Sequence, residues 1–122
     1  MTSLIFFFLL TCKHAVADLW LQANLTDAKH GSKLQLTKPR LWIHCLHHAV
    51  LTFIIALLLV GVGKAIMLAI LDFVLHFIID YTKHWLAERN KVTYKDKKYW
   101  QYAAVDQIAH YTTYFILVLL IL

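Results

Sequence analysis

The sequence is poor in the residues that soluble domains use for turns and for solvation. Its 122 residues include one proline and three glycines, and charged residues make up only 16% of the chain. Soluble domains carry about 25% charged residues, so this composition argues against a soluble domain. Hydrophobic residues make up 61% of the chain, which is typical of a protein that resides in a membrane.

Cysteines are also few, and they form no motif. Cys12 and Cys45 lie in apolar surroundings without C-x-x-C spacing, so we interpret them as small apolar helix residues rather than as a disulfide or thiolate ligands. The sequence contains no H-E-x-x-H motif and no phosphate-cradling glycine loop. These absences argue against a classical zincin and a nucleotide-binding enzyme.

Acidic residues are outnumbered by basic ones, which gives a formal net charge of +5. Most of the basic residues lie in two stretches, 29–40 and 83–98, which separate hydrophobic segments. Basic loops of this kind set membrane topology, so we expect no nucleic-acid partner. The positive-inside rule predicts a multi-pass membrane protein with both basic loops cytoplasmic and both termini on the other side.

The hydrophobic segments are each about 20 residues or more, long enough to span a membrane as helices. Pro39 suits the first turn of the second segment, and Gly61-Val62-Gly63 predicts a tight turn after it. The first segment resembles a signal peptide but lacks a basic n-region, so we expect an uncleaved helix. The prediction is an all-α polytopic four-transmembrane-helix bundle in one domain, 1–122, with helices at about 2–24, 39–62, 64–88 and 98–122.

Ionisable residues recur inside these apolar segments in pairs four residues apart. This spacing places both members on one helix face, and ionisable residues at membrane depth usually face the bundle interior. Counted from the predicted cytoplasmic helix ends, each pair places one residue in a shallow layer and the other in a layer about one turn deeper. The pairs are His14 and Asp18, His44 and His48, His76 and Asp80, and Asp106 and His110.

The pairs also follow an internal repeat. Positions 14, 18, 44 and 48 recur 62 residues later as 76, 80, 106 and 110. The offset predicts two helical hairpins that enter the membrane from the same side, as in a parallel repeat. Asp72, Lys83 and Gln107 have no polar counterpart in the other hairpin and would make the site asymmetric.

These motifs resemble those of a family of small bacterial and phage membrane proteins that is catalogued only as a domain of unknown function. The resemblance covers essentially the whole chain and implies a polytopic bundle in the bacterial inner membrane, but no activity. The family typically has an acidic residue, often glutamate, where this chain has Asp72. There is a more distant likeness to membrane-bound metal-dependent hydrolases. The matching motifs are His14-x3-Asp18-x3-Gln22, His44-x3-His48, Asp72-x3-His76-x3-Asp80-x2-Lys83 and Asp106-Gln107-x2-His110.

Imidazoles and carboxylates on facing helices are ligands for Zn²⁺, Mn²⁺, Fe²⁺ or Ni²⁺. We predict a site for one or two divalent ions, with zinc the first candidate. Gln22, Lys83 and Gln107 would support the ligands or line the rim, and Asp72 or Asp106 would act as general base. The predicted ligands are His14, Asp18, His44, His48, His76, Asp80, Asp106 and His110.

Three functions fit such a site. The first is a metal-dependent hydrolase of a lipid or lipid-linked phosphate, because a bound ion activates water and basic residues attract an anionic head group. The second is a non-enzymatic membrane protein with a structural His/Asp network, which would bind a host membrane protein or a second copy of itself. The third is proton or metal-ion transport, although the apolar outer half offers no polar exit.

Overall fold

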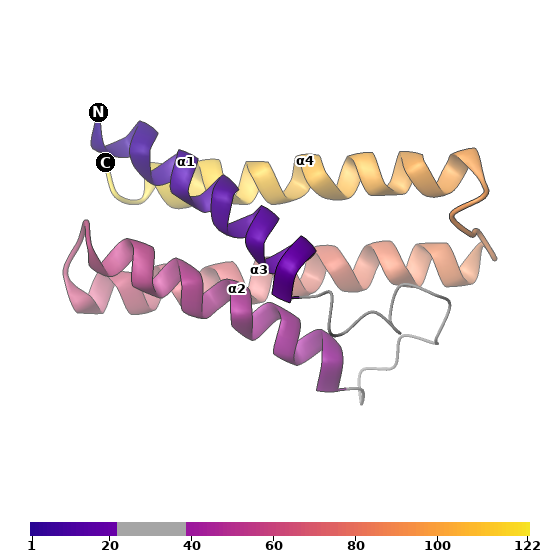
Figure 1. The fold of residues 1–122 in the computed structure, drawn as a ribbon, viewed down its shortest axis with the longest axis horizontal. Helices are drawn as coiled ribbons and strands as arrows, with labels where there is room; N and C mark the ends of the chain where they lie inside the picture. The colour runs from indigo at the N-terminus through magenta and orange to yellow at the C-terminus, as the bar shows by residue number, and fades with distance from the viewer. Residues whose placement is uncertain (22–38) are drawn as a thin grey trace.

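The computed structural model describes residues 1–21 and 39–122, whose regular structure is entirely helical. Figure 1 shows both termini and the α2–α3 turn at one end of the bundle and the α3–α4 loop at the other. The all-α prediction is confirmed for the described residues. The elements are α1 (Thr2–Ala15), η1 (Val16–Leu21), α2 (Pro39–Leu57), α3 (Val62–Arg89) and α4 (Lys97–Leu119).

Three helical stretches are long and apolar enough to cross a membrane, namely Thr2–Leu21, Arg40–Leu57 and Val62–Arg89. In the most apolar part of the first and third, only 28% of the residues are buried. Most of their apolar side chains therefore face outward, as side chains in contact with lipid would. Four such stretches were predicted, and α4 does not reach the same hydropathy because polar residues such as Asp106 and His110 line its buried face.

The first helix changes its winding where the sequence predicts a continuous α-helix to residue 24. From Val16 to Leu21 the chain forms a π-helix, a rare conformation that is frequent at functional sites. This segment carries Asp18, one of the predicted ligands. Gln22 and residues 23–24 lie outside the described residues.

The turn between α2 and α3 comes earlier than the glycine pattern predicts. α2 ends at Leu57 instead of continuing to residue 62, and the Val60 N–H donates to the Ala56 carbonyl at 2.8 Å. Gly61 has a φ of −63°, which any residue adopts, and a Cβ on Gly61 or Gly63 would meet nothing within 4 Å. The glycines therefore do not dictate the turn, and α3 begins directly after Gly61. The last helix ends at residue 119 rather than 122.

The interior of the bundle is divided along its length. An apolar cluster lies toward the end that carries both termini, and it includes Phe6, Leu10, Leu68 and Leu117. The buried polar side chains follow it toward the α3–α4 loop. The helices therefore hold their ionisable groups in one half of the bundle, as the layered sequence pattern predicts.

The α3–α4 loop is ordered by hydrogen bonds of its own. Thr93 donates its N–H and its hydroxyl to Asp96 Oδ2 at 2.7 and 3.0 Å, which lowers the pKa of this exposed carboxyl group. The indole N–H of Trp100 donates to the Tyr94 carbonyl at 2.9 Å. These bonds hold the aromatic residues of the loop against the start of α4.

Replacing Lys91 with glycine is expected to stabilise the protein by about 1 kcal/mol, because the left-handed backbone disfavours side chains with a Cβ. Lys91 follows the end of α3 with a φ of 52°, and its N–H donates to the Glu88 carbonyl at 3.1 Å. The midpoint of thermal unfolding in detergent measures the effect. Lys91→Ala is the control, because it removes the charge but keeps the Cβ; equal midpoints for the two variants would contradict the prediction.

Candidate metal centre

The structure brings all eight predicted ligands together in the polar half of the bundle. They form three groups in which one ligand atom from each residue lies within 4.8 Å of the others. These groups can hold a metal ion, because His and Asp atoms at such distances can share one cation. The groups are Asp18, His44, His48 and His76; His14, His76 and His110; and Asp80, Asp106 and His110.

The histidines of the predicted deeper layer pack against one another, and the rings of His48 and His76 are stacked. The ring centroids of His48 and His76 are 3.7 Å apart, those of His76 and His110 are 4.1 Å apart, and those of His14 and His110 are 4.8 Å apart. One histidine from each of the four helices therefore contributes to a single layer. The i, i+4 spacing produces this arrangement because each helix points the same face inward.

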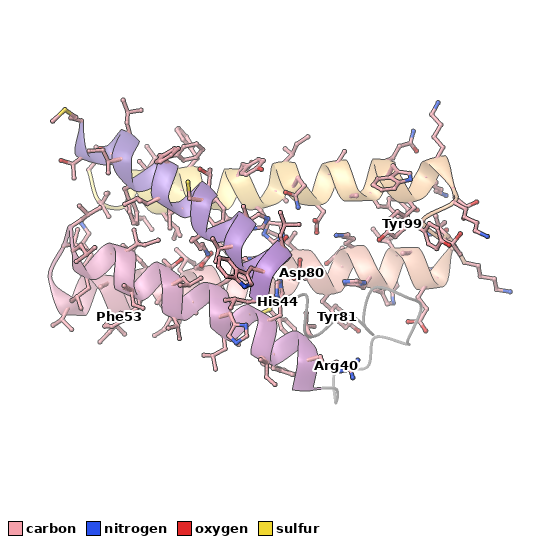
Figure 2. All side chains as sticks on the ribbon, in the orientation of Figure 1. Arg40, His44, Phe53, Asp80, Tyr81 and Tyr99 are labelled. Carbon is pink, nitrogen blue, oxygen red and sulfur yellow. The ribbon has the colours of Figure 1, made fainter. Side chains whose placement is uncertain are left out.

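Two aspartates in the shallow layer each face several of these rings. Asp80 Oδ1 lies 3.1 Å from His110 Nε2, and Asp80 Oδ2 lies 3.3 Å from the Nε2 atoms of both His44 and His76. Figure 2 shows His44 and Asp80 close together near the end of the first helix. Asp18 Oδ1 lies 3.1 Å from His48 Nε2, and Asp18 Oδ2 lies 3.2 Å from His14 Nε2.

The contacts repeat with the same offset as the sequence. His48 and Asp18 are separated by 3.1 Å, as are His110 and Asp80, which lie 62 positions later. Likewise, His14 lies 3.2 Å from Asp18, and its counterpart His76 lies 3.3 Å from Asp80. The offset of 62 residues therefore relates contacts within the cluster as well as positions in the sequence.

The spacing of these atoms suits a cation at their centre. Ligands about 2.1 Å from a metal lie about 3.0–3.4 Å from one another in octahedral or tetrahedral geometry, and most of the contacts above fall in this range. His14 Nε2 and Asp106 Oδ1 are buried without a hydrogen-bond partner. Buried polar atoms are normally satisfied, so these two atoms, like five others among the described residues, are available to a further partner.

A buried ion pair lies one layer deeper in the bundle than the His/Asp cluster and was not predicted from the sequence. The Lys13 ammonium group, 2% exposed, donates to Asp72 Oδ2 at 2.6 Å. The Thr52 hydroxyl donates to the same oxygen at 2.7 Å. A lysine inside an apolar segment is itself a signal, because such a residue is costly to bury without a partner. The sequence does not show that α1 and α3 bring Lys13 and Asp72 together.

Lys13 also fixes the role of His48. The Lys13 Nζ atom lies 3.3 Å from His48 Nδ1, and an ammonium group can only donate, so Nδ1 accepts. A neutral imidazole then carries its hydrogen on Nε2, which lies 3.1 Å from Asp18 Oδ1. His48 then donates from Nε2 to Asp18, and it also belongs to the ligand group of Asp18, His44 and His76.

Tyr114 holds another ligand in place. Its hydroxyl lies 2.7 Å from His14 Nδ1, so the other ring nitrogen of His14 is directed into the cluster. Metal-binding histidines usually have such a partner on the second nitrogen. No motif in the sequence distinguishes this tyrosine from the others.

The residues predicted to surround the ligands do so where the structure describes them. Lys83 Nζ lies 3.1 Å from Asp106 Oδ2, and the Gln107 side-chain amide donates to the same oxygen at 3.3 Å. Gln22 lies outside the described residues. Asp72 belongs to none of the three ligand groups, and its Oδ2 is occupied by Lys13 and Thr52, which disfavours a role as general base.

A pocket of about 360 Å³ connects this cluster with the α3–α4 loop. Its inner wall includes Asp18, His44, Asp80 and Asp106. Its outer wall is formed by Lys83, His84, Gln107 and the aromatic residues Tyr94, Tyr99 and Trp100. The cluster is therefore accessible from the polar end of the bundle, and the aromatic part of this wall was not predicted.

The fold and the cluster define a class: a small helical bundle with apolar outer faces and a buried His/Asp site that can hold a metal. The chain belongs to the family described as protein of unknown function (DUF3307), whose model matches residues 5–122. No curated protein and no solved structure matches it. The resemblance expected from the motifs is thereby confirmed at the level of the family, which carries no assigned activity.

Proposed function

We propose that this protein is a metal-dependent membrane hydrolase that acts on lipid or lipid-linked phosphate esters. The observation that carries the proposal is the convergence of three carboxylates and five histidines on one interior cluster that borders a pocket. A divalent ion held there would polarise a phosphoryl oxygen and make water nucleophilic near neutral pH. Zinc is the first candidate because His and Asp are common zinc ligands.

We propose that α4 crosses the membrane together with the other three helical stretches. Its polar side chains Asp106 and His110 are at most 4% exposed, so they avoid lipid. Its outward residues, such as Val105, Ile108 and Phe115, are more than half exposed and apolar. By the positive-inside rule, the α3–α4 loop faces the cytoplasm and both termini face the other side.

The depth of the cluster fits a substrate at the membrane surface. At 1.5 Å per residue, Asp80 lies about 27 Å along α3 from Val62, and Lys83 lies a few ångströms farther on. The hydrocarbon core is about 30 Å thick, so Lys83 reaches the head-group region when the α2–α3 turn lies at the opposite surface. A phosphate on a lipid head group can then enter the pocket beside Lys83 while the acyl chains stay in the bilayer.

The residues of the chain would bind and orient the phosphate ester. Lys83 would bind a phosphate oxygen in competition with Asp106, and Gln107 would hold Asp106 through its side-chain amide. Water would add to phosphorus as the ester P–O bond breaks, and the departing oxygen would take a proton from solvent in the pocket. The products are an alcohol and a phosphate.

The direct test is release of inorganic phosphate from phosphatidic acid in mixed detergent micelles by the zinc-loaded protein. We expect turnover for the native chain and at least about a tenfold loss for Lys83→Met, because a charge-assisted contact to phosphate is worth 1.5–3 kcal/mol. Lys95→Met is the control, because Lys95 lies in the α3–α4 loop near the pocket but does not line it. A protein that holds metal stoichiometrically yet releases no phosphate would contradict hydrolysis.

A second candidate function, a structural His/Asp network, is favoured by the contacts of Lys13. This residue joins Asp72, Thr52 and His48, and His48 in turn bonds Asp18, without any need for a metal. In that case His76→Ala would abolish folding together with function, whereas a catalytic centre would lose activity in a folded protein. Ion transport has less support, because the described core between the Lys13–Asp72 pair and the termini is apolar.

A further inference from the structure

Two of the three ligand groups share no member: one contains Asp18, His44, His48 and His76, and the other contains Asp80, Asp106 and His110. The third group, which contains His14, shares His76 with the first of these and His110 with the second. A single ion takes four to six ligands from one centre. An ion in one of these two separate groups would therefore leave the ligands of the other without a cation.

Asp80 connects the two groups through its two oxygens. Its Oδ1 lies 3.1 Å from His110 Nε2 in the second group, whereas its Oδ2 lies 3.3 Å from His44 and His76 in the first. A carboxylate whose oxygens face different ligand sets has the geometry of a bridge between two cations. Two-metal sites hold their ions about 3.5–4 Å apart, a distance that one carboxylate spans.

Asp18 repeats this division of its oxygens 62 residues earlier. Its Oδ1 lies 3.5 Å from His44 Nε2, and its Oδ2 lies 3.2 Å from His14 Nε2. His14 is the histidine whose Nε2 is buried without a hydrogen-bond partner, and it lies in a group with His110. Two independent aspartates thus face both halves of the cluster.

On the basis of the proposed metal centre, we infer that the site binds two divalent ions bridged by Asp80 and Asp18. One ion takes His44, His76 and an oxygen from each bridging aspartate. The other takes His14, His110 and Asp106 Oδ1 together with the remaining aspartate oxygens. His48, held by Lys13, orients Asp18.

The number of ions also selects the substrate class. The site contains the carboxylates of Asp18, Asp80 and Asp106, and Lys83 adds one positive charge. Two divalent ions would therefore leave a net charge of about +2 in the site. A phosphate monoester dianion neutralises this charge, whereas a carboxylic ester does not, so the inferred substrate is a lipid phosphate monoester.

Loading of the purified protein with MnCl₂ tests the inference, with bound manganese measured by elemental analysis after dialysis. We expect two ions per chain and an exchange-coupled Mn²⁺ pair in the electron paramagnetic resonance spectrum. His44→Ala and His110→Ala, which alter different ions, should each retain one uncoupled ion. His47→Ala is the matched control on the same helix, because His47 belongs to none of the ligand groups, and it should retain two.

The possible results distinguish a failure of this inference from a failure of the proposed function. One ion in the native chain, or two ions without coupling, would overturn the bridged pair but leave a metal-dependent hydrolase intact. No bound ion in a folded native chain would overturn both. Since the count and the coupling are measured on the native chain, the test does not depend on the folding of the alanine variants.

Discussion

Replacing Lys13 with methionine is expected to destabilise the protein by about 3–5 kcal/mol, because it leaves the Asp72 carboxylate buried without its counter-ion. Both side chains are at most 2% exposed, and their charged atoms are 2.6 Å apart. Thr52 still donates one hydrogen bond to Asp72, but a hydroxyl does not neutralise a charge. The free energy of unfolding in mixed micelles titrated with sodium dodecyl sulfate measures the loss.

The double variant Lys13→Met/Asp72→Leu tests whether the lost stability comes from the unpaired charge of Asp72 or from the lost contact. Replacing both members of a buried pair with apolar residues is often neutral or stabilising, so most of the lost stability should return. Lys64→Met is the matched control, because this lysine at the start of α3 is exposed and its replacement should have little effect. A double variant no more stable than Lys13→Met would show that the pair is not coupled as the structure indicates.

Replacing Asp80 with asparagine is expected to weaken metal binding by at least about 100-fold, more than the loss of a supporting hydrogen bond. The substitution keeps the size of the side chain but replaces one of the two oxygens that face His44, His76 and His110 with an amide nitrogen that does not bind metal. Metal content after dialysis against a weak chelator measures the effect, and phosphate release should fall with it.

The control for this variant is Asp96→Asn, which removes an exposed aspartate of the α3–α4 loop whose carboxylate accepts hydrogen bonds from Thr93. It should bind metal as the native chain does. If Asp80→Asn retained the metal content of the native protein, the assignment of Asp80 as a bridging ligand would be wrong.

Much of the candidate site could be predicted from the sequence because it depends on helical periodicity. Ionisable residues four positions apart must share a helix face. In a bundle of apolar helices, such a face points to the interior. His76 and His110 therefore meet at 4.1 Å although they lie on different helices. The all-helical fold and the family membership were predictable for the same reason, since they depend on local patterns that cover nearly the whole chain.

The features that could not be predicted depend on contacts between helices. The pairing of Lys13 with Asp72 requires that α1 and α3 lie at a particular rotation and height, which no local pattern specifies. The role of His48 follows from that pairing and is therefore equally hidden. The position of the α2–α3 turn depends on where α2 stops rather than on Gly61, whose backbone conformation any residue can adopt.

Elemental analysis of the native protein, purified without added metal, tests the metal-centre assignment most directly, with His76→Ala prepared in parallel. His76 belongs to two of the three ligand groups, so its loss affects most of the cluster. The assignment predicts at least one equivalent of a divalent transition metal per native chain and a lower metal content in a folded His76→Ala variant. A native protein that is well folded and free of metal would contradict it.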